Sequence, residues 1–231
     1  MLKNEVRANA FDEKVGLEQA KLAVKWGVGK SVLDIGCGIG MFTPLFLKKF
    51  KRVVGLDPSE KYLKVARRNK KIEYVVGYGE TFKLDEGFDT ISMNMLLEHV
   101  DSPVKVLRNC KKHLNKGGRI IAQVPNAESI TRRLGVLMGV IPSLDYTSKK
   151  ERDLYGHQRT YTLKTLVRDA QKAGLTVKES GGILYKPLPN EMLLLLSKKY
   201  GEAWTTKLIK TLIKFGETRP EECAAIYIIC E

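Results

Sequence analysis

Short apolar runs and helical stripes of apolar residues alternate along most of this chain. The apolar runs have the length of buried strands and cover residues 31–35, 52–56, 72–76, 88–93 and 118–124. Between them, apolar residues recur at helical spacing over 41–50, 59–69 and 104–114, and a first amphipathic helix is predicted over 11–25. Strands that alternate with helices predict a parallel sheet covered by helices, which is an α/β fold.

The C-terminal part adds one clear helix and two more strands. Apolar residues from Leu163 to Ala173 mark the helix, Thr162 is placed to cap it and Gly174 to end it, and strands are predicted over 176–179 and 224–229. Two long segments, 125–160 and 181–222, do not fit the alternation, and the second has the spacing of two helices. Segments this long in a compact domain are usually functional. We therefore expect a single domain over 1–231 in which 125–160 and 181–222 are candidate lids over a substrate.

A glycine-rich turn follows the first strand. The chain reads Asp34-Ile35-Gly36-Cys37-Gly38-Ile39-Gly40, and the second strand ends at another acid, Asp57. Glycine is needed where the backbone takes positive φ or where a ligand approaches without a Cβ in the way. An acid at the end of the second strand can accept hydrogen bonds from ribose hydroxyls. The alternative is a turn whose glycines only permit close packing.

This pattern resembles the first two motifs of the class I S-adenosylmethionine-dependent methyltransferases. The resemblance implies a Rossmann-like, seven-stranded, mostly parallel sheet with an antiparallel last strand, flanked by helices. It implies that S-adenosyl-L-methionine is the cofactor, rather than a dinucleotide with its G-x-G-x-x-G loop. The residues that it assigns to the methionine part and the ribose are Asp34, Gly36, Cys37, Gly38, Gly40, Asp57 and Pro58.

Two later runs extend the resemblance toward the ubiquinone and menaquinone methyltransferases. Gly79 and Glu80 match the segment that lies against the adenine, although Tyr78 stands where many relatives have Asp. After the fourth strand, the run from Asn94 to Val100 matches residues that line the cofactor, here Asn94, Met95 and Leu96, before the E-H-V turn. The alternatives are that Glu80 is a surface acid and that Met95 and Leu96 are plain core.

The third run that matches is Gly156-His157-Gln158-Arg159-Thr160-Tyr161-Thr162. In many small-molecule members the histidine of this run faces the active site, and an oxygen nucleophile needs a base such as histidine. His157 and His99 are therefore the candidate catalytic residues. His99 has an alternative role as a backbone hydrogen-bonding residue.

Composition adds one unusual number, a formal net charge of +14. This charge fits either a solvated lysine-rich surface or a surface that binds nucleic acid. Because aromatic residues do not alternate with the basic ones, the solvated surface is the favoured interpretation. The chain shows no membrane-length apolar run and no signal peptide at its start, so we expect a cytoplasmic protein. The four cysteines form no C-x-x-C pair, and no metal is expected.

We therefore predict an enzyme that methylates a small-molecule acceptor, with a hydroxyl oxygen as the favoured target. An RNA methyltransferase that uses the basic surface is one alternative, but the position after the fourth strand reads Asn94-Met95-Leu96-Leu97 and lacks the N/D-P-P-Y/F motif of nucleic-acid enzymes. The other alternative is a protein that binds the cofactor without catalysis.

Overall fold

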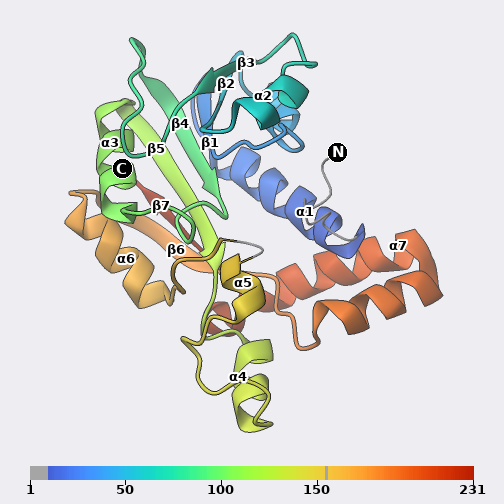
Figure 1. Ribbon diagram of the computed structural model, residues 1–231. Coiled ribbons are helices and arrows are strands. Elements are labelled where there is room, and N and C mark those ends of the chain that lie inside the picture. Colours follow the sequence, from blue (N-terminus) through green and yellow to red (C-terminus); the bar gives the residue numbers. More distant parts are fainter. Residues whose placement is uncertain (1–9, 154–155) are drawn as a thin grey trace.

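One seven-stranded sheet organises the protein. The computed structural model describes residues 10–153 and 156–231 (Figure 1). The strand order is β3-β2-β1-β4-β5-β7-β6. Only β7 runs antiparallel to both of its neighbours, which confirms the predicted mostly parallel sheet with an antiparallel last strand. The strands are β1 (Ser31–Ile35), β2 (Arg52–Asp57), β3 (Glu73–Val76), β4 (Phe88–Asn94), β5 (Leu114–Pro125), β6 (Val177–Ile183) and β7 (Ala225–Cys230).

Helices cover both faces of this sheet (Figure 1). One apolar cluster packs α3 and α6 against one face, and a second packs α1, η1 and α2 against the other. Burial on both faces explains why the central strands read as unbroken apolar runs. The helices are α1 (Ala10–Trp26), the 3-10 helix η1 (Thr43–Lys48), α2 (Glu60–Ala66), α3 (Pro103–Lys112), α4 (Ile130–Leu137), α5 (Lys149–Asp153), α6 (Leu163–Lys172), α7 (Asn190–Gly216) and the 3-10 helix η2 (Pro220–Glu222).

Several element boundaries differ from the predicted ones. The segment 41–50 forms only the short 3-10 helix η1, with i to i+3 hydrogen bonds such as Lys49 N to Phe46 O at 3.0 Å. Leu114 starts β5 rather than ending α3. The predicted strand 176–179 runs on to Ile183, through Gly181 and Gly182, which were predicted to begin the segment 181–222. The reason for these glycines is packing, because a Cβ on Gly181 would lie 2.8 Å from the Tyr227 ring.

The two long segments fold as helices at one end of the sheet. The segment 125–160 contains α4 and α5. In the other segment, α7 is two helices joined at Gly201, whose φ of 83° breaks the helical path, so the two predicted helices are confirmed. Figure 1 shows these two halves side by side as a hairpin next to α1. An ion pair of 2.5 Å between Lys14 and Glu202 and a third apolar cluster join the hairpin to α1. None of the described helices is long and apolar enough to cross a membrane.

Candidate functional site

The glycine turn after β1 is held against the end of β2. The backbone N–H groups of Gly36 and Cys37 both donate to Leu56 O, at 2.7 and 3.1 Å. Gly38 has a φ of 55°, and a Cβ added there would meet nothing within 4 Å. Its backbone is therefore open to a ligand. Gly40 differs, because a Cβ there would lie 2.8 Å from the Tyr74 hydroxyl, so at Gly40 the packing explanation applies.

The two acids of the motif support this turn. Asp57 accepts hydrogen bonds from Gly38 N and Ser59 N, both at 2.9 Å, through different oxygens. Each carboxylate oxygen has a second lone pair that a ribose hydroxyl could use. Asp34 is buried and accepts from the Thr43 hydroxyl at 2.7 Å. Burial raises the pKa of Asp34 to about 7. The hydrogen bond from Thr43 lowers this pKa, and the negative charge of Asp57 raises it further.

A cleft of about 540 Å³ opens beside the turn, at the carboxyl ends of β1 and β2. Its wall includes five of the predicted cofactor residues, Gly36, Pro58, Gly79, Glu80 and Leu96, and also His99. Ser102 and Lys105, from the start of α3, line it too. Neither residue was predicted from the sequence, because only the packing of α3 against the sheet brings them to the cleft.

The other predicted cofactor residues lie around this cleft rather than in its wall. Asn94 ends β4, and its side-chain oxygen is buried without a hydrogen-bond partner among the described residues. Met95 follows with a φ of 51°. Cys37 packs toward Gly55, and burial raises the pKa of its thiol, so this cysteine is not a reactive thiolate.

These features fit S-adenosyl-L-methionine. The open backbone at Gly38 leaves room for a ligand against the chain, and the Asn94 oxygen offers an unused acceptor to an ammonium group. The volume of the cleft lies in the range of small-molecule sites. The residues that would hold the cofactor come from the ends of β1, β2 and β4, the usual ligand edge of an open α/β sheet.

The two predicted catalytic histidines lie together at the rim of the cleft. Their ring centroids are 4.9 Å apart in an edge-on arrangement. The Nε2 atom of His99 lies 3.7 Å from a carboxyl oxygen of Glu98. Burial and the neighbouring His99 lower the pKa of His157, so its imidazole is largely neutral at neutral pH. A neutral imidazole can accept a proton from a hydroxyl group.

Glu98 is a further candidate functional residue, one that was not among those predicted from the sequence. It is 2% exposed, and neither of its carboxyl oxygens has a hydrogen-bond partner among the described residues. Burial raises its pKa to about 8. Unsatisfied buried carboxyl groups are rare and tend to occur at functional sites. The E-H-V run contained this residue, but nothing in the local pattern indicated its burial.

Arg159 explains how His157 reaches His99. Its guanidinium donates to the carbonyl oxygens of Leu97 at 2.8 Å, Asp101 at 3.2 Å and Val100. Gln158 adds three bonds to the same turn, from its backbone N to Glu98 O and from its side chain to His99 O and to the Asp101 carboxylate. The H-x-R motif therefore clamps the segment that carries His157 onto the turn after β4.

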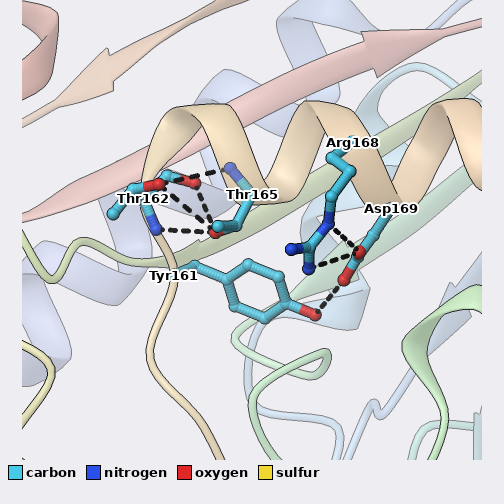
Figure 2. A network of polar contacts seen from close by, with 5 residues as sticks. All are labelled: Tyr161, Thr162, Thr165, Arg168 and Asp169. Carbon is cyan, nitrogen blue, oxygen red and sulfur yellow. Dashed lines mark hydrogen bonds and ion pairs between the residues drawn. The ribbon is translucent and has the colours of Figure 1, made fainter.

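The far end of that segment is fixed at α6, as Figure 2 shows. Thr162 and Thr165 form a capping box at the start of the helix, which confirms the predicted cap. The Tyr161 hydroxyl donates to Asp169 at 3.3 Å, and Arg168 pairs with the same carboxylate at 2.8 Å. The segment that follows His157 is thus anchored twice, by Gln158 and Arg159 at the turn after β4 and by Thr162 at the start of α6.

Glu98, His99 and His157 also form a set of metal-ligating groups. One ligand atom from each lies within 4.8 Å of the others. A carboxylate and two imidazoles suit zinc and other first-row transition metals. Sequence spacing did not point to this set, because His157 is far along the chain from the other two and only the Arg159 clamp brings it near.

Comparison with known proteins gives consistent results. A family model described as a methyltransferase domain matches residues 12–180. A ubiquinone biosynthesis O-methyltransferase from Pseudomonas fluorescens is 29% identical over 193 residues, which are 80% of this chain and 77% of that protein. One from Aliivibrio fischeri is 30% identical over 167 residues, which are 69% of this chain and 70% of that protein.

Solved structures share the fold. An S-adenosylmethionine-dependent methyltransferase from Mesorhizobium loti matches with a TM-score of 0.65 at 16% identity, over 96% of this chain and 99% of that one. A possible histamine N-methyltransferase from Thermotoga maritima matches with a TM-score of 0.63 at 22% identity, over 94% of this chain and 89% of that one. Since the family match runs from the first helix into β6, this chain belongs to the methyltransferase domain family, as a class I enzyme that uses S-adenosylmethionine.

Proposed function

We propose that this enzyme methylates a hydroxyl oxygen of a small-molecule acceptor, with His157 as the general base. The observation that carries the proposal is the pair of His157 and His99 at the rim of the cofactor cleft, clamped to the turn after β4. The named activity of the curated relatives, O-methyl transfer in ubiquinone biosynthesis, supports an oxygen target.

The cofactor supplies a methyl group on a sulfonium, which is already a good leaving group. The protein therefore has to position the acceptor and remove its proton. His157 accepts this proton because burial keeps its imidazole neutral, and His99 packs against it as the second candidate. Asp34, Asp57 and the open Gly38 hold the cofactor, with Asn94, Met95 and Leu96 on its other side. In this proposal α4, α5 and the α7 hairpin cover the acceptor and keep water out.

The test compares His157→Gln, His99→Gln and the wild type for release of S-adenosylhomocysteine, with methyl 3,4-dihydroxybenzoate as the probe acceptor. A general base contributes about a hundredfold or more. We expect His157→Gln to lose at least that much in kcat/KM and to lose the rise of the wild-type rate with pH at a pKa below 6.5. Affinity for S-adenosylhomocysteine should stay unchanged. The control is His113→Gln, since His113 lies away from the cleft, with its Nε2 bonded to Leu84 N.

Two results would contradict the proposal. One is a pH profile of His157→Gln that equals the wild-type profile, because this substitution removes the proposed base. The other is methyl transfer to bulk tRNA with no transfer to a panel of phenols, alcohols and amines, which would favour the basic surface as an RNA-binding face. Steeply salt-dependent tRNA binding would accompany that second result.

A further inference from the structure

A second, smaller cavity lies at the same edge of the sheet as the cofactor cleft. Its volume is about 270 Å³. It is formed where β4, β5 and β6 end and β7 begins, and α1 and the start of α7 close it. The residues that line it include Asp12, Gln19, Met95, Ile183, Leu184 and Lys186. Met95 lines this cavity and the next residue, Leu96, lines the cofactor cleft, so the two spaces meet at the turn after β4.

The backbone is strained at two points of this wall. Among the described residues, Met95 and Leu184 are the non-glycine residues with positive φ, at 51° and 66°, and both line the cavity. Hydrogen bonds hold both in place, from Met95 N to Gln123 O and from Ala224 N to Leu184 O, each 2.8 Å. Such strain persists only where the surrounding structure enforces it, and it is concentrated at functional sites.

Lys186 brings a positive charge into this largely apolar space. Its ammonium donates to the Asn190 side-chain oxygen at 2.6 Å, and the Asn190 amide in turn donates to Asp12 at 2.7 Å. The neutral side-chain amide of Asn190 therefore bridges the Lys186 ammonium and the Asp12 carboxylate. An ammonium has three N–H donors, so this arrangement leaves capacity for a further acceptor. Burial lowers the pKa of Lys186, while Asp12 and Glu191 act in the opposite direction.

We propose that this cavity holds the methyl acceptor and that Lys186 binds an anionic group of it, a carboxylate or a phosphate. The rest of the acceptor packs against Met95, Ile183 and Leu184, and the reacting hydroxyl points past Met95 toward the cofactor cleft. The inference rests on the proposed function, because it assumes a small-molecule acceptor, and it names the chemical class of that acceptor as a small organic acid.

The test measures binding of matched probes to protein saturated with S-adenosylhomocysteine. The probes are 3,4-dihydroxybenzoate, its neutral methyl ester and phenyl phosphate, and isothermal titration gives each dissociation constant. In the wild type we expect at least one of the two anions to bind about tenfold or more tightly than the ester, since charge-assisted hydrogen bonds are the strong ones. Lys186→Gln should reduce the preference to about twofold or less, and Lys186→Arg should keep most of it. The relative affinity of the two anions shows whether a carboxylate or a phosphate is the better fit.

Lys198→Gln is the matched control, because Lys198 is an exposed lysine of α7, the helix that follows Lys186. It should keep the wild-type preference. A merely structural role for Lys186 would weaken the acid and the ester equally. The proposal is overturned if the wild type binds none of the probes at 10 mM, if it does not prefer either anion, or if Lys186→Gln keeps the preference. Failure of the proposed function would appear separately, as no release of S-adenosylhomocysteine with any small acceptor.

Discussion

Replacing Glu98 by glutamine should change how stability depends on pH. Glu98 is 2% exposed, and its carboxyl oxygens have no hydrogen-bond partner among the described residues. Burial raises the pKa of this carboxyl group from 4.5 to about 8, and the nearby Arg159 offsets only part of the rise. In metal-free protein the fold therefore keeps Glu98 protonated at a pH where the unfolded chain has lost the proton.

The sign follows from proton linkage. Below pH 4.5 both states carry the proton, so stability is full, and between pH 4.5 and about 8 the folded state holds one proton more than the unfolded state. The free energy of unfolding then falls by up to about 1.4 kcal/mol for each pH unit in this window. The total loss has an upper limit of about 5 kcal/mol. A glutamine has nearly the same shape and does not titrate, so it avoids this loss.

Urea unfolding in EDTA, followed by circular dichroism at pH 5, 6, 7 and 8, measures the effect. The free energy of unfolding of Glu98→Gln minus that of the wild type should grow steadily as the pH rises. Glu13→Gln is the control, because Glu13 is an exposed glutamate of α1, and its difference from the wild type should stay nearly flat. A pH-independent difference for Glu98→Gln would refute the assignment of a buried, uncompensated carboxyl group.

Two further predictions test the site. Gly38→Ala and Gly117→Ala should lose similar stability, about 1–2 kcal/mol, because both glycines have positive φ and open space at the Cβ position. Only Gly38→Ala should also weaken binding of S-adenosylhomocysteine in isothermal titration, and equal affinities would show that no ligand approaches Gly38. The donor set of Glu98, His99 and His157 predicts that EDTA-treated protein binds Zn²⁺ and that His157→Ala weakens this binding about tenfold or more. The same zinc affinity in both proteins would contradict a role of His157 as a ligand.

The local patterns predicted the elements whose determinants lie close together in the chain. The apolar runs predicted the bounds of β1, β2 and β4 to within one residue, and Thr162 predicted the start of α6. Both signals are local, because burial periodicity and helix capping act over a few residues. Predictions failed where a distant partner decides the conformation. Gly181 and Gly182 lie in β6 because Tyr227 and the 3-10 helix η2 pack over them, and Leu114 begins a strand because it pairs with Phe88.

By itself, the sequence determined the α/β fold, the glycine turn between two acids and, through them, the family and its cofactor. These depend on short-range spacing, on backbone conformations that only glycine adopts easily and on the edge where parallel strands end. Tertiary structure alone decided how the rest of the site is assembled. The Arg159 clamp brings His157 to His99, burial leaves Glu98 without a partner, and the packing of α1 against α7 places Lys186 beside Met95. Each of these contacts joins residues that are far apart in the chain, and burial and electrostatics act through space.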